Sequence, residues 1–245
     1  MNKILVIGGA GFVGRHIVAR LVDRGLRVTV PTRHRARARH LILLPTVEVV
    51  ENDVNRDDVL DGLLRDHDAV INLVGILQGS RGTPYGPEFA RAHVELPRRV
   101  VAGCTRRGIR RYLHMSALGA DPNGPSMYQR SKGDGEAAVR ASSLDWTIFQ
   151  PSVIFGPEDR FLNTFATLAR FFPVLPIGGA DVRFQPVWIG DVADAFVNAL
   201  DNRDTYRKVY ELAGPSVYTL RELVQFAAAA SGHPRPVVAL PGGIA

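Results

Sequence analysis

Cysteine and long apolar runs are scarce in this sequence. Cys104 is the single cysteine among 245 residues, which excludes an internal disulfide and favours a reducing compartment. No apolar run approaches the ~20 residues of a membrane-spanning helix, so we expect any membrane association to be peripheral. An apolar segment begins two residues after Met1, and we expect no targeting peptide before it. These features predict a cytoplasmic protein, with association at the inner face of a membrane as the alternative.

Positive charge is abundant, but the features that usually accompany nucleic-acid binding are absent. The formal net charge is +6, and arginines gather at Arg33–Arg39, Arg98–Arg99, Arg106–Arg107 and Arg110–Arg111. We predict no nucleic-acid binding and no metal site, because there is no zinc-ligand spacing, no interleaved aromatic platform and no recognisable helix-turn-helix. Solvated helix faces and loops account for most of these arginines. Attraction to a phosphate-bearing ligand or an acidic partner surface is the remaining consequence.

The first 150 residues alternate between apolar, strand-like runs and patterns of helical period. Strands are expected near 3–8, 27–31, 47–50, 69–74, 111–116 and 146–150, and helices near 12–24, 56–65, 88–107 and 128–142. This alternation predicts an α/β protein with a doubly wound parallel sheet, the Rossmann fold, in strand order 3-2-1-4-5-6. Ligands then bind at the carboxyl ends of the first and fourth strands, where Gly8 and Gly75 stand.

The sequence pattern changes after Pro151, where glycines and prolines divide the chain into short segments. Helices are expected near 160–171, 191–201 and 219–231. We therefore predict a dinucleotide-binding domain over 1–150 and a smaller substrate-covering region over 151–245, interleaved with the edge of the sheet. The last residues, 241–245, offer no element to close the second region, which suggests a truncated or unusually short member of its class.

Closely spaced glycines join the first strand to the first helix. The segment Gly9-x-Gly11-x-x-Gly14 fits the dinucleotide fingerprint, with glycines for a tight turn, for close approach to the pyrophosphate and for helix-against-strand packing. The amides freed at this junction and the positive end of the helix dipole both face an anion. The sequence therefore predicts a dinucleotide site that uses Gly8, Gly11, Phe12 and Val13.

The end of the second strand bears on the choice of dinucleotide. A site selective for NAD(H) usually carries Asp or Glu about 20 residues after the glycines, to bind the ribose 2′-hydroxyl. This chain instead has Thr32 and Arg33, with Arg35 as a second cation, which suits a 2′-phosphate and favours NADP(H). NAD(H) stays open, because Arg33 also fits a solvated run of arginines. Asp53 is expected either to reach the adenine or to cap the next helix.

Tyr128 and Lys132 lie four residues apart at the start of a predicted helix, and so on one face of it. An ammonium beside a phenol favours the phenolate, so we expect Lys132 to lower the pKa of Tyr128 from about 10 and make it a general acid or base. The alternative is an ordinary pair on a helix surface.

Six motifs follow one another along the chain in the order that a known family shows: the glycine loop, Asp53-Val54, Asn72-Leu-Val-Gly75, Ser116, Tyr128-x-x-x-Lys132 and Pro151-Ser-Val-Ile-Phe-Gly156-Pro157. The chain resembles the short-chain dehydrogenase/reductase superfamily in its extended and atypical branch. The resemblance implies that Tyr128 transfers a proton, that Lys132 also binds the nicotinamide ribose and that Ser116 steadies the substrate oxygen. It also assigns cofactor contacts to Val54, Gly75 and Pro151.

Three further segments, 115–120, 128–136 and 155–163, are similar to the NADPH-binding accessory subunit of respiratory complex I and its bacterial relatives. We expect an NADP(H)-binding oxidoreductase or epimerase-like protein that transfers a hydride. The alternative is a non-catalytic NADPH-binding subunit or assembly factor, associated peripherally with a respiratory complex. The sequence names neither the small-molecule substrate nor the oligomeric state.

Two positions depart from the pattern of extended members. The catalytic serine of the family falls either at Ser116 or where this chain has Ala117. His93 stands where many extended members have an asparagine. It is expected to bond the sheet, to contact ligand or simply to pack, and packing is favoured.

Overall fold

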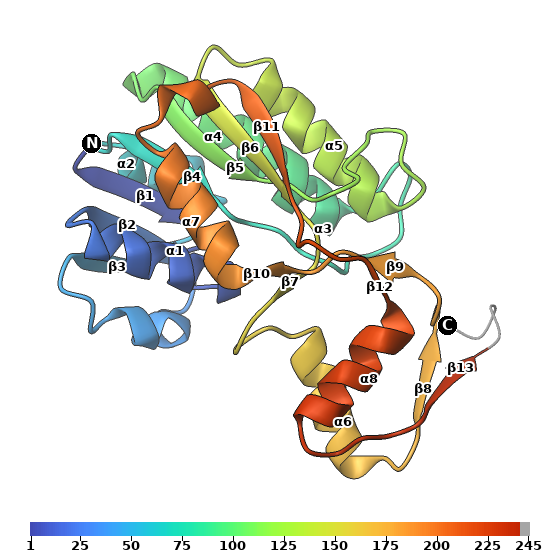
Figure 1. Ribbon diagram of the computed structural model, residues 1–245. Helices are drawn as coiled ribbons and strands as arrows, with labels where there is room; N and C mark the ends of the chain where they lie inside the picture. Colours follow the sequence, from blue (N-terminus) through green and yellow to red (C-terminus); the bar gives the residue numbers. More distant parts are fainter. Residues whose placement is uncertain (241–245) are drawn as a thin grey trace. The chain divides into compact units, whose positions relative to one another are not determined.

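Seven parallel strands form the central sheet of the computed structural model, which describes residues 1–240 (Figure 1). Its order is β11-β6-β5-β4-β1-β2-β3, so the predicted order 3-2-1-4-5-6 is confirmed and one strand is added at the edge. The strands are β1 (Lys3–Ile7), β2 (Arg27–Thr32), β3 (Val47–Glu51), β4 (Ala69–Asn72), β5 (Arg111–Met115), β6 (Asp145–Pro151) and β11 (Lys208–Leu212). The expectation for residues 241–245 lies outside the described residues.

Contacts divide the chain into two compact units, and the sheet belongs to the first, Met1–Pro151 with Gly190–Leu212. The helical elements of this unit are α1 (Phe12–Asp23), the 3-10 helix η1 (Arg35–Leu41), α2 (Asp57–Leu63), α3 (Pro87–Phe89), the π-helix η2 (Ala90–Glu95), α4 (Leu96–Arg107), α5 (Met127–Arg140), α7 (Ile189–Ala199) and the 3-10 helix η3 (Arg203–Thr205). The single helix expected over 88–107 is thus three consecutive pieces.

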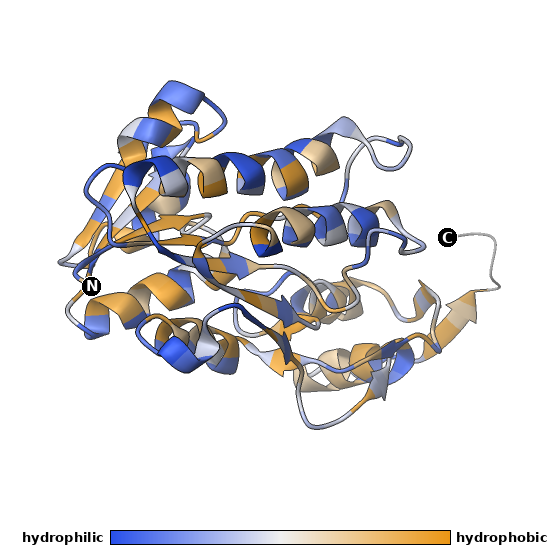
Figure 2. Cartoon of the chain, turned by 90° about the horizontal axis from the view of Figure 1, so that it is seen from above, coloured by the Kyte–Doolittle hydropathy of each residue, from blue (hydrophilic) through white to orange (hydrophobic). Residues whose placement is uncertain are grey.

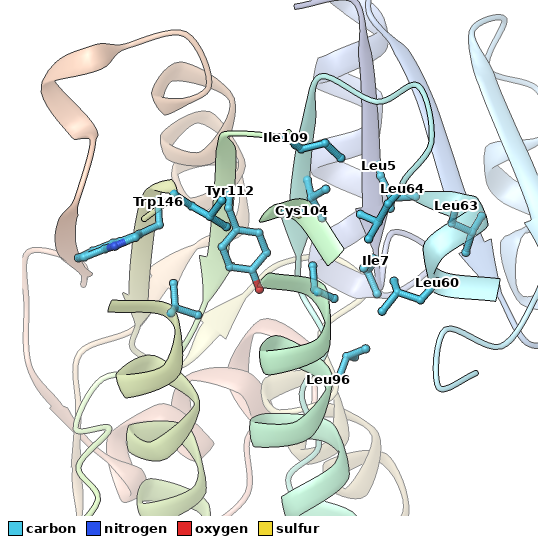
Figure 3. Close-up of a cluster of buried hydrophobic side chains, with 14 of the residues drawn as sticks. Leu5, Ile7, Leu60, Leu63, Leu64, Leu96, Cys104, Ile109, Tyr112 and Trp146 are labelled. Atoms are coloured by element: carbon cyan, nitrogen blue, oxygen red, sulfur yellow. The ribbon is translucent and has the colours of Figure 1, made fainter. Parts of the chain in front are cut away.

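Residues that alternate along the strands build the core on both faces of the sheet. Leu5, Ile7 and Tyr112 pack with side chains of α2, α4 and α5 in one buried cluster (Figure 3). On the other face, the ring of Phe149 lies 4.3 Å from that of Phe196 in α7. In Figure 2 the helices carry both hydrophilic and hydrophobic residues, as expected of helices with one buried side.

A buried arginine holds the segment that leads from α7 into the edge strand β11. Arg111 on β5 is 2% exposed, and its guanidinium donates to the carbonyl oxygens of Ala199 and Leu200 and to Thr205 Oγ1. It also lies over the ring of Tyr206, 4.6 Å from the centroid. Burial lowers the pKa of Arg111 to about 10. These bonds fasten the segment between α7 and β11 to the sheet.

The second unit comprises Ser152–Ile189 and the residues from Ala213 on. It contains short strand pairs and two helices: β7 (Ile154–Phe155), β8 (Leu175–Gly178), β9 (Arg183–Phe184), β10 (Val187–Trp188), β12 (Tyr218–Thr219), β13 (Val237–Leu240), α6 (Leu162–Phe171) and α8 (Leu220–Ala230). A small apolar core that includes Ala169, Ile177 and Val224 joins α6, α8 and the β8–β13 pair. A capping box between Thr219 and Glu222 starts α8.

Residues 1–240 contain neither a helix suited to cross a membrane nor a side-chain cluster suited to hold a metal ion. None of their helices combines the length and the apolar character that crossing a membrane requires. Nor do three or more His, Cys, Asp or Glu side chains of this part of the chain gather in a way that could hold a metal ion.

Candidate functional site

The turn between β1 and α1 is made of glycines that have no room for a side chain. Gly8 has a φ of +87°, and a Cβ added there would lie 3.2 Å from the backbone carbon of Leu73. A Cβ at Gly14 would lie 2.4 Å from the oxygen of Gly8 and 2.5 Å from the Cα of Gly9. Gly14 therefore lets the helix pack against the strand end. The turn spans residues 8–10 between the end of β1 at Ile7 and the N-cap Gly11, so it includes the first glycine of the fingerprint, Gly9.

Helix α1 begins at this turn with no side chain to cap it. Its N-cap is Gly11, in extended conformation, and no side-chain hydrogen bond caps the helix. The first four amides of an α-helix have no partner within the helix, so those of the first turn, which include Phe12 and Val13, are suited to an anion. The turn and the helix dipole make this end of the sheet suited to bind an anion.

The strand ends next to the turn carry the residues expected at the adenosine end. Thr32 closes β2, and its hydroxyl donates to the oxygen of His34 at 3.1 Å. Arg33 is exposed and makes no ion pair within residues 1–240. Its charge is near enough to contribute to a lowered pKa at Asp53, on the segment after β3. The structure thus brings Thr32, Arg33 and Asp53 to one edge of the sheet.

Asp53 does not cap α2, so that alternative is wrong. Its Oδ1 accepts hydrogen bonds from Asn55, at 3.0 Å from the backbone nitrogen and 2.7 Å from the side-chain nitrogen. The bond from the backbone of Asn55 is the main cause of the lowered pKa of Asp53. Helix α2 has Arg56 as its N-cap, without a side-chain bond. Val54, also expected at the cofactor, is half-buried against the core.

The loop after β4 contacts the glycine turn on one side and α5 on the other. Asn72 is fully buried, and its Oδ1 accepts from the amide of Val74 at 3.2 Å, which shapes the loop. The Cβ that Gly8 lacks would touch Leu73 and Val74 of this loop. At Gly75 a Cβ would lie 3.1 Å from Lys132 Nζ. The predicted cofactor residues Gly8, Gly75 and Lys132 therefore form a continuous row beside the carboxyl ends of the strands.

Lys132 is buried and fastened to the end of β5. A capping box between Ser126 and Gln129 starts α5 ahead of it. Lys132 is 3% exposed, and its Nζ donates to the oxygen of Met115 at 3.1 Å. Burial lowers its pKa to about 8, since desolvation disfavours the ammonium.

Tyr128 lies one helical turn earlier, among aromatic rings. Its ring meets those of Phe89 and His93 edge-on, at 6.5 and 5.5 Å between centroids. Burial raises the pKa of Tyr128 to about 12, so the expected lowering by Lys132 is wrong. The spacing of four residues predicted a shared helix face correctly. It did not predict that the ammonium binds a strand carbonyl or that packing partly desolvates the phenol.

Ser116 follows β5 next to the strand carbonyl that Lys132 binds. It is 3% exposed, its amide donates to the oxygen of Phe149, and its Oγ has no hydrogen-bond partner in the described part of the chain. Ala117, at the alternative serine position, is also buried. Pro151 ends β6, and its oxygen accepts from Leu118 at 2.9 Å. Ser116 and Pro151 therefore lie at the carboxyl ends of neighbouring strands.

His93 is hydrogen-bonded rather than simply packed, so the favoured interpretation is wrong. The amide of Ile76 donates to its Nε2 at 3.0 Å, and its Nδ1 lies 2.8 Å from Ser131 Oγ. The ring is 1% exposed, and burial is the main reason that its pKa falls to about 3. Its position, where relatives in the extended branch carry a polar asparagine, was the signal that pointed to a polar contact.

Comparison with known proteins now decides the family. The sequence matches the family described as NAD(P)H-binding over residues 8–164, which is more than half of the chain. The chain belongs to this NAD(P)H-binding family. A second family, described as the RmlD substrate binding domain, matches residues 118–239. The resemblance to the extended branch of the short-chain dehydrogenase/reductase superfamily is therefore confirmed.

Relatives of this NAD(P)H-binding chain include both respiratory subunits and a reductase. NADH dehydrogenase [ubiquinone] 1 alpha subcomplex subunit 9, mitochondrial, of Arabidopsis thaliana is 37% identical over 226 residues, which cover 90% of this chain and 56% of that protein. Ceramide reductase of Caulobacter vibrioides is 31% identical over 194 residues, covering 79% of this chain and 59% of the reductase. The chain thus spans less than two-thirds of the length of either relative.

The fold of the family also recurs among solved structures. UDP-glucose 4-epimerase of Thermus thermophilus, in complex with NAD, superposes with a TM-score of 0.80. The match covers 98% of this chain and 88% of that one, at 22% identity. At this identity the likeness shows a shared fold.

Proposed function

We propose that the chain is an NADP(H)-dependent oxidoreductase or epimerase-like protein whose reaction is carried by Tyr128. The observation that carries the proposal is the unbroken stretch from the glycine turn, through the loop at Gly75, to buried Lys132. The ammonium of Lys132 is buried, which costs stability, and buried charged groups of this kind are typical of functional sites. When bound, the nicotinamide cofactor supplies the hydride.

Each part of the dinucleotide has residues suited to hold it. We assign the diphosphate to Gly8, Gly11, Phe12 and Val13, and the adenine to Asp53 and Val54. Thr32 and Arg33 take the 2′-phosphate, since an exposed arginine without an ion pair is a ready partner for it. The nicotinamide half falls to Gly75, Lys132 and Pro151. NADP(H) is therefore the preferred cofactor, and NAD(H) is the second choice.

The proton chemistry is assigned to Tyr128, whose side chain is half-buried. Its pKa is raised to about 12 by desolvation, so the phenol carries its proton at neutral pH and is available to donate it to a substrate oxygen during reduction. Ser116, whose Oγ lacks a partner within residues 1–240, is suited to donate a hydrogen bond to the same oxygen. Substrate contact is assigned to the second unit, supported by the RmlD substrate binding domain match over 118–239.

Single-turnover kinetics test this assignment. The protein is loaded with NADPH and mixed with panels of ketones, quinones and nucleotide sugars, and the loss of reduced nicotinamide is followed. Tyr128→Phe is expected to slow the reaction by about 10²–10⁴-fold, the usual contribution of a positioned proton donor. Tyr206→Phe, which keeps its ring against Arg111 ahead of β11, is the matched control and should react normally. Equal rates in all three proteins would refute the role of Tyr128.

The respiratory relatives support a second candidate function. The first relatives carry the names of NADH dehydrogenase subunits, so this chain is also suited to hold NADPH as a structural ligand in a respiratory-type complex, peripheral to the membrane. In that case NADPH should raise the melting temperature by the amount that mass action gives, with no turnover of any substrate. Turnover that depends on Tyr128 would instead support the enzyme.

A further inference from the structure

His93 occupies the centre of a local widening in the helix that precedes β5. The segment Ala90–Glu95 is a π-helix between α3 and α4. A π-helix adds a residue to the turn and is found mostly as short insertions, frequently at functional sites. Here the insertion lies beside α5, the helix that carries Tyr128 and Lys132, and the two elements pack closely.

One face of α5 rests on His93 at three successive levels. The ring of His93 meets the ring of Tyr128, its Nδ1 bonds Ser131 Oγ, and its backbone oxygen would lie 2.0 Å from a Cβ at Gly135. Residues at i, i+3 and i+7 share one side of a helix. Gly135 therefore permits a backbone approach that brings this side of α5 against His93.

The bonds of the imidazole ring define its tautomer. Nε2 accepts from the amide of Ile76 and so carries no proton. The ring proton is on Nδ1, which donates to Ser131 Oγ. The hydroxyl of Ser131 in turn donates to the backbone carbonyl oxygen of Tyr128 at 2.9 Å. Every donor in this chain of bonds has an acceptor. A neutral ring is required, and burial, which lowers the pKa of His93 to about 3, keeps it neutral.

The far end of this chain of bonds is the loop that meets Lys132. Ile76 directly follows Gly75, and a Cβ on Gly75 would lie 3.1 Å from Lys132 Nζ and 3.7 Å from His93 Nε2. The loop backbone is thus fixed between the ammonium and the imidazole. Within residues 1–240, His93 is the one side chain that accepts a hydrogen bond from Ile76 N.

We infer that His93 is a positioning residue that ties the Gly75–Ile76 loop to α5 and so holds Gly75 in place for the nicotinamide half of the cofactor. This inference rests on the proposed function, which gives Gly75 and Lys132 to that half. His93 acts on the cofactor through the loop and through Ser131. Its loss should therefore weaken contacts of the nicotinamide ribose and leave those of the adenosine end unchanged.

Binding of two ligands distinguishes an effect at the nicotinamide end from one at the adenosine end. NADPH reaches both, whereas adenosine 2′,5′-bisphosphate lacks the nicotinamide ribose. His93→Phe keeps an aromatic ring beside Phe89 and Tyr128 but loses both hydrogen bonds. We expect it to raise the Kd for NADPH by about tenfold and leave the Kd for adenosine 2′,5′-bisphosphate unchanged. In His93→Gln the amide oxygen can still accept from Ile76, and the ratio of the two Kd values should return toward that of the unmodified protein.

A second buried histidine provides the matched control. His67, 8% exposed, also bonds through both ring nitrogens, to the oxygen of Arg65 and to Thr29 Oγ1. His67→Phe removes the same number of bonds and should leave the ratio of Kd values unchanged. Ser131→Ala removes only the partner of Nδ1, and it serves if His93→Phe fails to fold; it should raise the ratio as well.

The outcomes are distinct. An unchanged ratio in a folded His93→Phe protein, or in Ser131→Ala when His93→Phe does not fold, overturns the inference. So does an equal weakening of both ligands. If the unmodified protein binds neither ligand, the proposed function fails and the inference fails with it.

Discussion

The two ends of the candidate site differ in the residues that form them: glycines at one end and buried polar side chains at the other. At the glycine turn the chain needs residues without a side chain, because a Cβ on Gly8 or Gly14 would meet backbone atoms. The end proposed for the nicotinamide half instead contains buried polar side chains, with Lys132 at 3% and His93 at 1% exposure. The first end tolerates no added atom. The second depends on charges and hydrogen bonds that are costly to bury.

The largest effect should come from adding an atom to the first end. In Gly14→Ala the new Cβ would lie within 2.4–2.6 Å of Gly8 and Gly9, which forces the helix away from the strand. We expect a loss of about 1–3 kcal/mol in the free energy of unfolding. We also expect a fall of about a hundredfold in affinity for NADPH. Thermal unfolding and fluorescence titration measure the two.

Gly62→Ala is the control for that substitution. Gly62 lies in α2, and its added Cβ would have no neighbour within 4 Å. This change should stabilise the protein by about 0.5–1 kcal/mol, as alanine does in a helix, and leave NADPH binding intact. Equal behaviour of the two variants would contradict the close packing inferred at Gly14.

The buried charge at the second end should show the opposite sign in stability. Burial lowers the pKa of Lys132 from 10.5 to about 8. Between these values the unfolded chain binds more protons than the folded one, so the cost of burying the ammonium is fully present below about pH 8 and fades as the pH approaches about 10.5. Lys132→Met should therefore stabilise the protein by up to about 3 kcal/mol near pH ~7, and by less near pH ~10.

The same substitution should impair ligand binding, because it removes the ammonium assigned to the nicotinamide ribose. Chemical denaturation at the two pH values and titration with NADPH measure both effects. Lys208→Met, on an exposed residue of β11, should show neither. A Lys132→Met protein that is destabilised equally at both pH values would show that the buried ammonium does not carry the cost described here.

A smaller effect is expected at the 2′-phosphate. Arg33→Gln should weaken NADPH binding by about tenfold and leave NADH binding unchanged, since only NADPH presents that phosphate. The loss should shrink at high salt because the arginine is exposed. Arg37→Gln removes the same charge from the exposed side of η1 and should change neither affinity. Parallel weakening of NADPH and NADH by Arg33→Gln would argue against a role in cofactor choice.

The smallest effect is expected at Asp53. Asp53→Asn keeps an oxygen that accepts from the amide of Asn55, so the turn after β3 should persist. The affinity for NADPH should change by less than about threefold, equivalent to under about 1 kcal/mol. A larger loss would show that the carboxylate charge itself serves the adenine. Titration of the variant beside the unmodified protein decides this.

The sequence predicted the backbone-built end well because its physics leaves a local signature. Buried parallel strands leave continuous apolar runs, and a tight turn before a helix leaves glycines. Strand β11 was missed because its residues are half-buried or exposed at a sheet edge, without such a run. The glycine turn itself lies where these glycines predict it, at residues 8–10 after β1.

The side-chain end was only partly predictable. The spacing of Tyr128 and Lys132 gave their shared face, but the direction of the Tyr128 pKa depends on burial, which tertiary packing decides. The π-helix that holds His93 has no signature in composition. Its contacts to Ile76 and Ser131 join segments 17 and 38 residues away along the chain, which no local pattern specifies.

The most direct test of the central claim is calorimetric titration of the unmodified chain with NADPH, and with NADH in parallel. A site formed by the glycine turn and the β4 loop predicts one dinucleotide per chain, with NADPH bound about tenfold more tightly than NADH. Binding of neither dinucleotide would contradict the account.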